Sequence, residues 1–241
     1  MFKLIIMLKL ILIYCSCFLL YCTVTPIKDC KPDRTEGVLT ISSINQLQNL
    51  RTDSIVEIGI TSQLLTEFPS DIFHFKVKRL DLSFNNIASI PCEIQNLDNL
   101  QALSLVDNNI QNLQECFELN DLLLLNLSGN KITVISPIIS AKNICHLALS
   151  FNNITTLPNN IDNLQYLFYL NLNNNSISKI PEEICNLSNL RTLLLNSNNI
   201  TELPECFYSM KNLVTVDLRN NPLNAKTVES LKKMNIEGVI Y

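Results

Sequence analysis

Few side chains in this sequence have the type and spacing that chemistry requires. The chain contains two histidines, His74 and His146, and His146 directly follows Cys145, which suggests a nucleophile beside a general base. Two adjacent residues do not make such a pair, and the sequence places no carboxylate to orient the imidazole. We therefore predict an ordinary surface histidine at position 146, no catalytic residues and no enzyme activity.

Phosphate and metal sites have equally little support. The four glycines, Gly37, Gly59, Gly129 and Gly238, lie too far apart for a phosphate-binding loop or a dinucleotide fingerprint. Nine cysteines are present, but those beyond the first 24 residues show no C-x-x-C spacing. We therefore expect no metal site and no cofactor.

The composition favours a folded interaction module. Of 241 residues, 47% are apolar and 17% are charged, and the formal net charge is −4. Asparagine is abundant, but so much apolar content is not typical of a disordered tract. Without Lys3 and Lys9, which lie in the first 24 residues, 16 basic residues face 22 acidic ones, a net charge of −6. This balance argues against binding to nucleic acid or to an anionic membrane surface.

The first 24 residues, MFKLIIMLKLILIYCSCFLLYCTV, differ from the rest of the chain. A short basic start followed by the apolar run 10–24 is typical of a secretory signal peptide. Counted from Leu4, however, the stretch approaches the roughly 20 residues that span a bilayer. No motif of small residues marks a cleavage site. We favour a cleaved signal peptide, and the alternative is a membrane anchor formed by residues 4–24.

A repeat of 22 or 23 residues organises the chain from residue 55 onward. Each unit has an asparagine with apolar residues eight, five and three positions before it and two and five positions after it. Eight units start at positions 55, 77, 100, 122, 144, 167, 190 and 213, and Gln63 replaces the asparagine in the first. The repeated asparagines are Asn85, Asn108, Asn130, Asn152, Asn175, Asn198 and Asn221. A fixed period of this length predicts stacked units that bury one continuous core.

The spacing within each unit predicts its local structure. Alternating apolar residues, such as Leu193 and Leu195, indicate a short strand with one buried face. The asparagine then turns the chain inward, and its amide can bond to the backbone of the bend, so stacked units place these amides in a ladder. Later apolar pairs, such as Ile184 and Leu187, have helical spacing. Prolines that suit the first turn of a short helix are Pro69, Pro91, Pro158, Pro181 and Pro204.

The repeats imply a domain organisation with a cover at each end, because a unit of this kind is stabilised by its neighbours. We expect residues 1–24 to be the signal peptide or anchor and residues 25–54 an N-terminal linker and cap. Residues 55–223 hold the eight repeats, and residues 224–241 form a C-terminal cap. Within that cap, residues 227–234 are predicted to be helical.

The pattern L-x-x-L-x-L-x-x-N-x-L, followed by L/I-P-x-x-I-x-x-L, resembles the leucine-rich repeat family, and its 23-residue form with proline is similar to Ras-group scaffolds. This resemblance covers residues 55–223. It implies an α/β fold: a leucine-rich repeat solenoid with a parallel concave β-sheet and short helical or extended convex segments. It also implies protein binding without catalysis. Three units depart from the pattern, at Gln63, Gln114 and Ser136, and irregular loops are expected there.

In a solenoid of this family, the strand residues between the buried ones face the concave surface, where members usually bind partners. The middle units would present an apolar and aromatic centre there, with a charged rim, which is the composition of a protein-binding hot spot. The residues predicted to bind a partner are Leu124, His146, Phe168, Tyr169 and Arg191. The alternative is that some of these side chains tuck beside a neighbouring strand and only cover the sheet.

Four cysteines recur at similar places in adjacent units. Cys92 and Cys116 follow their asparagines by seven and eight positions, and Cys185 and Cys206 follow theirs by ten and eight. Either pair could reach the Cα separation of a disulfide bond in an oxidising compartment. We favour the other interpretation, small buried apolar side chains on the convex side, because free cysteine is commonly buried.

These observations together predict a non-catalytic protein-binding module that enters the secretory pathway and recognises a protein partner through its concave face. The alternative is a membrane-anchored or intracellular signalling scaffold of the Ras-group type. We expect no nucleic-acid partner, and contact with a membrane only through residues 4–24 if that segment is not cleaved.

Overall fold

Short parallel strands, one from each repeat, build the part of the protein that the structure describes. The computed structural model describes residues 39–47, 55–234 and 238–241, all of which belong to one unit of the chain, Thr35–Tyr241. The predicted signal or anchor segment, residues 1–24, lies outside the described residues. Over the described ranges, every helix is too short or too polar to cross a membrane.

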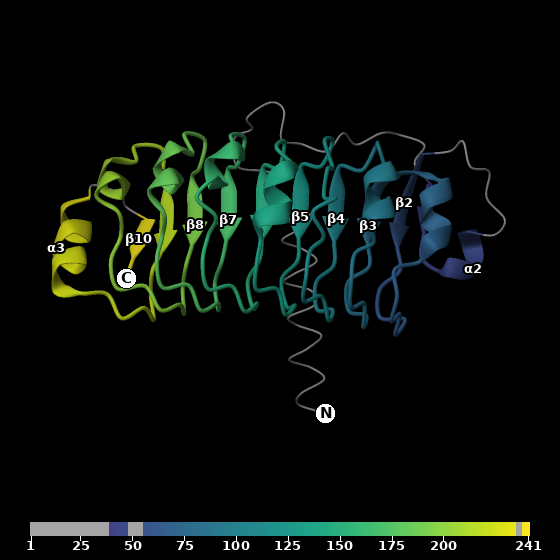
Figure 1. Cartoon of the computed structure of the whole chain (residues 1–241), viewed down its shortest axis with the longest axis horizontal. Helices are drawn as coiled ribbons and strands as arrows, with labels where there is room; N and C mark the ends of the chain where they lie inside the picture. The colour runs from purple at the N-terminus through teal and green to yellow at the C-terminus, as the bar shows by residue number, and fades with distance from the viewer. Residues whose placement is uncertain (1–38, 48–54, 235–237) are drawn as a thin grey trace. The chain divides into compact units, whose positions relative to one another are not determined.

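Ten strands form one parallel sheet in which the order in space is the order in the chain (Figure 1). The strands are β1 (Leu39–Ile41), β2 (Ile55–Gly59), β3 (Lys76–Asp81), β4 (Ala102–Ser104), β5 (Leu124–Asn126), β6 (His146–Ala148), β7 (Tyr169–Asn171), β8 (Thr192–Leu194), β9 (Thr215–Asp217) and β10 (Gly238–Ile240). Strands β2–β9 coincide with the eight predicted units, and β1 and β10 flank them. The predicted parallel solenoid is confirmed.

Short 3-10 helices return the chain along the other side of the core and cover one face of the sheet (Figure 1). They are η2 (Ser70–His74), η3 (Cys92–Asn96), η4 (Ser136–Ser140), η5 (Ile161–Asn163), η6 (Glu182–Asn186) and η7 (Glu205–Ser209). A proline precedes η2, η3, η6 and η7 directly, because its fixed φ suits the start of a helix. The third unit has Gln114 in the proline position and forms no helix between β4 and β5. We call this side the helical face and the opposite side the sheet face.

The core lies between the sheet and the helical segments and passes through every unit. In the fifth unit, for example, Leu147 in the strand, Leu149 directly after it, and Ile161 and Leu164 from the helical side are all 0% exposed. Each such side chain contributes about 1.5–3 kcal/mol on burial. Because every unit buries its two flanks only against its neighbours, stability depends on the stack and not on any single unit.

The repeated asparagines lie at the bend after each strand and join neighbouring units. Asn152 Nδ2 donates to the carbonyl of Leu127 in the preceding unit at 3.0 Å and to that of Leu149 in its own unit at 3.1 Å. Its Oδ1 accepts the N–H of Ile132, also in the preceding unit, at 2.9 Å. Equivalent bonds to the preceding unit are made by Asn85, Asn108, Asn130, Asn175, Asn198 and Asn221. These amides therefore satisfy backbone groups that the bend takes out of the sheet.

The residue directly before each repeated asparagine has a left-handed backbone conformation. Its φ is +71° at Gly129, and it lies between 50° and 59° at Phe84, Asp107, Phe151, Asn174, Ser197 and Asn220. A side chain in this conformation costs roughly 1–2 kcal/mol. Gly129 avoids that cost, and a Cβ at this position would overlap the Asp107 carboxylate. The sharp inward turn therefore stores strain in most units, which the asparagine bonds and the core offset.

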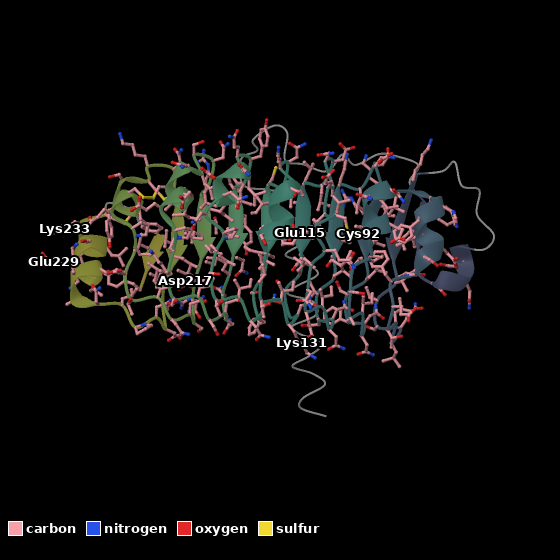
Figure 2. The ribbon with its side chains drawn as sticks, viewed as in Figure 1. Cys92, Glu115, Lys131, Asp217, Glu229 and Lys233 are labelled. Carbon is pink, nitrogen blue, oxygen red and sulfur yellow. A yellow bond between two sulfur atoms is a disulfide. The ribbon has the colours of Figure 1, made fainter. Side chains whose placement is uncertain are left out.

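Each end of the described stack has an added strand and helix. At the first, β1 pairs with β2, α2 (Ile44–Leu47) follows β1, and Gln63 Nε2 donates to the carbonyl of Ser42 at 2.9 Å. At the other, β10 pairs with β9, and α3 (Ala225–Lys233) begins two residues earlier than predicted, because Asn224 caps it. A Glu229–Lys233 ion pair of 2.9 Å joins consecutive turns of α3 (Figure 2). The domain boundaries at 24, 54 and 223 stay predictions.

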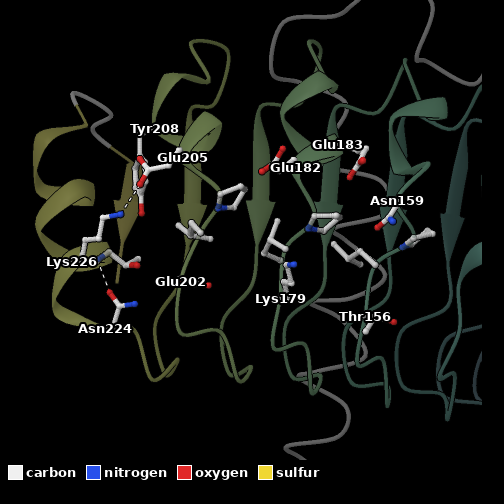
Figure 3. Close-up of a pocket in the computed structure, with 17 residues that line it drawn as sticks. Thr156, Asn159, Lys179, Glu182, Glu183, Glu202, Glu205, Tyr208, Asn224 and Lys226 are labelled. Atoms are coloured by element: carbon white, nitrogen blue, oxygen red, sulfur yellow. Dashed lines mark hydrogen bonds and ion pairs between the residues drawn. The ribbon is translucent and has the colours of Figure 1, made fainter.

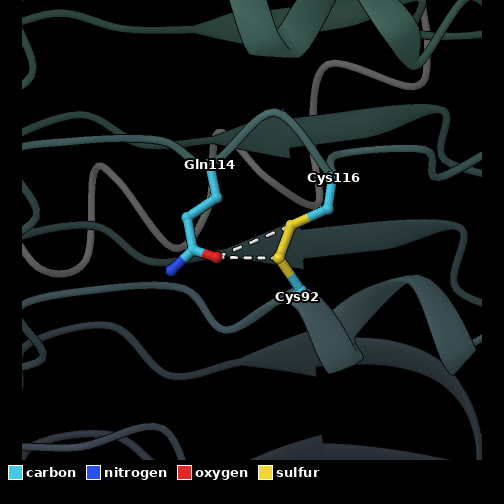
Figure 4. Close-up of a disulfide and its surroundings, with 3 residues drawn as sticks. All are labelled: Cys92, Gln114 and Cys116. Atoms are coloured by element: carbon cyan, nitrogen blue, oxygen red, sulfur yellow. Dashed lines mark hydrogen bonds between the residues drawn. A yellow bond between two sulfur atoms is a disulfide. The ribbon is translucent and has the colours of Figure 1, made fainter.

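Two disulfide bonds join adjacent units on the helical face. Cys92 is bonded to Cys116 and Cys185 to Cys206, with Cα–Cα distances of 5.4 Å and 6.0 Å. Our preferred interpretation of these cysteines as free apolar side chains is therefore wrong. Parallel stacking brings similar positions of neighbouring units within disulfide reach, which is about 4.4–6.8 Å. The side-chain oxygen of Gln114 lies 2.7 Å from Cys92 Sγ (Figure 4).

Candidate protein-binding site

The sheet face carries rows of side chains that are not needed for the core. Because each strand is in register with the next, the third residues of successive units lie side by side. The row reads Arg79, Ala102, Leu124, His146, Tyr169, Thr192 and Thr215. The types of these side chains determine the chemical character of the sheet face.

Aromatic side chains gather at the middle of the sheet face. The ring centroid of His146 lies 5.4 Å from that of Tyr169 and 6.0 Å from that of Phe168, and both pairs are stacked. The Arg191 guanidinium carbon lies 5.8 Å from the centroid of the Phe168 ring. Arg191 is exposed and the three rings are half-buried. The structure therefore brings four of the five predicted binding residues together, and we call His146, Phe168, Tyr169 and Arg191 the aromatic patch.

Leu124 does not contribute to the surface as predicted. It lies beside His146 in the same row, but it is only 8% exposed. In the row it stands between Ala102 and His146. The expectation of an exposed Leu124 is therefore wrong.

Charged pairs lie on the sheet at either side of the aromatic patch. Arg79 Nε on β3 is 3.1 Å from Glu57 Oε1 on β2. Near the other end of the sheet, Arg219 Nη2 is 2.6 Å from Asp217 Oδ2. The hydrogen bond from the Arg219 side chain lowers the pKa of Asp217 below its usual value. An aromatic centre with charged groups around it matches the usual layout of a protein interface.

Neither Cys145 nor His146 has the environment of a catalytic group. Burial lowers the pKa of His146 below its usual value near 6.5, so the imidazole is neutral at pH 7 and stacks as an uncharged ring. Cys145 is 2% exposed and is disulfide-bonded, so it offers no free thiol as a nucleophile. Across the described ranges, no three His, Cys, Asp or Glu residues are grouped so that they could hold a metal ion.

The fold and the site together define a solenoid. Its outward strand residues differ in type from unit to unit, whereas apolar core residues recur at the same positions. A family model described as a leucine-rich repeat region matches residues 147–238, and a model for the Leucine Rich Repeat matches residues 76–97. The chain is a leucine-rich repeat protein. These matches do not identify the Ras-group subclass, which stays a prediction.

Known proteins with similar repeats belong to several kinds of molecule. The chain is 39% identical over 87 residues to a probable serine/threonine-protein kinase of Dictyostelium discoideum, a match that covers 33% of this chain and 7% of the kinase. It is 34% identical over 80 residues to Toll-like receptor 6 of Bos taurus, which covers 33% of this chain and 10% of the receptor. The chain thus spans a tenth or less of either relative, so their whole activities do not transfer to it.

Two solved structures share the fold. Internalin C2 of Listeria monocytogenes is 24% identical with a TM-score of 0.64, and the match covers 76% of this chain and 78% of that one. The leucine-rich repeat ectodomain of a plant membrane receptor kinase from Arabidopsis thaliana, solved in complex with CASPARIAN STRIP INTEGRITY FACTOR 2, is 21% identical with a TM-score of 0.64. That match covers 84% of this chain and 28% of the ectodomain. At these identities the likeness establishes the fold alone.

The binding residues predicted from the sequence all lie on the sheet face, and none was predicted on the helical face. There the structure has a hollow across the later units, lined by residues that no prediction assigned to a binding site. A signal was present, because acidic residues recur around the prolines of neighbouring units, at Glu182, Glu183, Glu202 and Glu205. Only the stacking of the units brings these carboxylates to one hollow.

Proposed function

We propose that this leucine-rich repeat protein captures a protein partner through the aromatic patch on its sheet face. The observation that carries the proposal is the contiguous stack of His146 with Phe168 and Tyr169, next to Arg191. Tyr and Arg are enriched among the residues that dominate binding energy. Tyr buries a large area with few rotatable bonds, and Arg offers a planar guanidinium that can bond a carboxylate through two N–H groups. A partner that covers the rings would gain their burial and could place a carboxylate on the exposed guanidinium.

The interpretation as a protein of the secretory pathway is supported by the disulfides. Structural disulfides persist in oxidising compartments and are rare in the cytosol. Cys92–Cys116 and Cys185–Cys206 each close a loop of just over 20 residues, and a cross-link of that size stabilises a fold by about 3 kcal/mol. The alternative remains a membrane-anchored or intracellular signalling scaffold of the Ras-group type.

The N-terminus of the mature protein separates these alternatives. A start after about residue 22 supports cleavage of a signal peptide, and an intact Met1 supports the anchor. Alkylation of free thiols before and after reduction adds a second measurement. Protected cysteines at positions 92, 116, 145, 185 and 206, all of them disulfide-bonded in the structure, support the oxidising compartment. Free thiols at these positions in the protein from its native source contradict it.

The aromatic patch is tested by one substitution with a control of the same residue type. Tyr169 lies in the patch, whereas Tyr166 is 50% exposed three residues earlier and outside the strand. Once affinity capture has identified a partner, its dissociation constant is measured for wild type, Tyr169→Ala and Tyr166→Ala. A hot-spot residue is worth about 2 kcal/mol or more, so we expect Tyr169→Ala to weaken binding roughly 30-fold. Equal affinities for the three proteins would remove the patch from the binding site.

A further inference from the structure

We propose that the helical face carries a second binding site, a groove that takes an extended segment of a partner protein rich in lysine or arginine. The groove lies across units five to seven and reaches α3 (Figure 3). Its volume is about 870 Å³, which falls within the roughly 300–1,000 Å³ of typical ligand sites. It lies on the helical face and shares no lining residue with the aromatic patch.

The repeat itself builds the floor of the groove. Leu157, Ile180 and Leu203 occupy the same position in three consecutive units, and each is followed by a proline. The three apolar side chains are 3–7% exposed, so the core fixes their positions. Residues of α3 close the end of the hollow that lies next to the last unit. A floor formed in this way is rigid before any ligand arrives, which lowers the entropic cost of binding.

The walls of the groove are acidic. Four carboxylates line it, from Glu182, Glu183, Glu202 and Glu205, against two ammonium groups, from Lys179 and Lys226. Lys226 is already engaged, because its Nζ lies 2.7 Å from Glu205 Oε1. This hydrogen bond, together with the charges of Glu205 and Glu202, raises the pKa of Lys226 above its usual value. In the described part of the chain, Glu182, Glu183 and Glu202 form no ion pair, so the groove has a net negative charge that favours a basic ligand.

The length of the groove fits an extended peptide. Equivalent residues of neighbouring units in a parallel stack are spaced by about 4.8 Å, so the floor from the fifth to the seventh unit spans roughly 10 Å. An extended chain advances about 3.3 Å per residue, so three to five residues cover the floor and reach α3. Neighbouring side chains of an extended peptide point to opposite sides, and both walls of the groove carry carboxylates (Figure 3). Basic residues on one side of such a segment would therefore meet Glu182, Glu183 and Glu205, and a basic residue on the other side would meet Glu202, which lies on the same side as Lys179 (Figure 3).

The repeat supplies a matched control for this site. Glu183 and Glu202 line the groove, and Glu93 and Glu67 occupy the same two repeat positions in units two and one, outside the groove. The double variants Glu183→Gln/Glu202→Gln and Glu93→Gln/Glu67→Gln therefore change the net charge equally. The probe is a fluorescein-labelled peptide of six arginines, and its binding to the full chain is measured by fluorescence anisotropy at two salt concentrations.

We expect the hexa-arginine peptide to bind the wild-type protein, more weakly at high salt, and to lose at least fivefold in affinity with Glu183→Gln/Glu202→Gln. The Glu93→Gln/Glu67→Gln protein and Tyr169→Ala should bind as the wild type does, and a peptide of six glutamates should not bind. Equal losses in both double variants would show general attraction to an acidic protein and overturn the proposal. A loss with Tyr169→Ala, or no binding at low salt, would overturn it as well. Circular dichroism spectra verify that each variant is folded.

Discussion

Truncation of one ladder amide, Asn152→Ala, tests directly what holds the stack together. Asn152 is 7% exposed. The variant removes the acceptor of the Ile132 N–H and the donor to three carbonyls, those of Leu127, Leu149 and, more weakly at 3.3 Å, Ser150. An unsatisfied buried N–H costs about 1–3 kcal/mol. The carbonyls of Leu127 and Leu149 each keep one amide donor, from Asn130 and Asn175 respectively. Loss of the Asn152 donor therefore costs less at each of these carbonyls, about 0.5–1.5 kcal/mol of unfolding free energy. We expect the free energy of unfolding to fall by about 3 kcal/mol.

Urea unfolding followed by circular dichroism measures this change. With a slope near 3 kcal/mol/M, a loss of about 3 kcal/mol moves the midpoint by roughly 1 M. A second probe, tyrosine fluorescence, shows whether the stack still unfolds in one transition, since repeat proteins can lose cooperativity when one interface weakens. Two transitions in the variant would place the weak point at the interface between the fourth and fifth units, which Asn152 joins.

Two controls separate hydrogen bonding from packing at this position. Asn153 is the next residue and is exposed, so Asn153→Ala should change stability by no more than about 0.5 kcal/mol. Asn152→Leu restores most of the volume without the hydrogen bonds and should be at least as unstable as Asn152→Ala. If Asn152→Ala is as stable as Asn153→Ala, or if leucine restores the wild-type midpoint, the amides do not hold the units together and our explanation of the ladder is refuted.

Two further substitutions probe backbone strain and charge. Phe151 has a φ of 55° and is 52% exposed. Phe151→Gly should therefore raise the unfolding free energy by up to about 1 kcal/mol in the same urea assay. Any destabilisation would contradict strain at this bend. The hydrogen bond from Arg219 lowers the pKa of Asp217, so its stabilisation is complete above the usual pKa near 3.9 and is lost as the pH falls through the lower folded value. Asp217→Asn should remove that part of the acid dependence, measured as thermal midpoints from pH 7 to pH 2, and an unchanged profile would mean that the ion pair does not contribute.

The features that recur in every unit were the ones that could be predicted from the sequence. The spacing of Leu193, Leu195 and Asn198 predicts a strand and a bend by local rules, and repetition turns those rules into a sheet. Features that depend on one particular pair of units were not predicted. The distance between Cys92 and Cys116 follows from the stacking of two loops, one of which lacks a helix, and the spacing of the cysteines alone allowed both a disulfide and two buried thiols.

Exposure on the sheet face was the other quantity that the sequence could not supply. The repeat places Leu124 and Tyr169 at equivalent positions, yet Leu124 is buried and Tyr169 is half-buried, so the position in the repeat does not determine exposure. The left-handed residue before each asparagine was missed for a similar reason. Phenylalanine, serine and aspartate occupy it as well as glycine, so its residue types do not reveal the backbone conformation.

The separation of roles within each unit leaves two faces of the fold available for the two binding surfaces that we propose. The core residues and the asparagine amide make the bonds between units, and both are set by the repeat. The side chains of His146 and Glu202 belong neither to the core nor to the ladder, so they can differ from their equivalents in other units without disturbing the stack. Substitutions at the aromatic patch and in the groove should therefore leave unfolding midpoints near wild type while they change binding. A patch variant that lost both together would show that the rings stabilise the sheet and do not serve a partner.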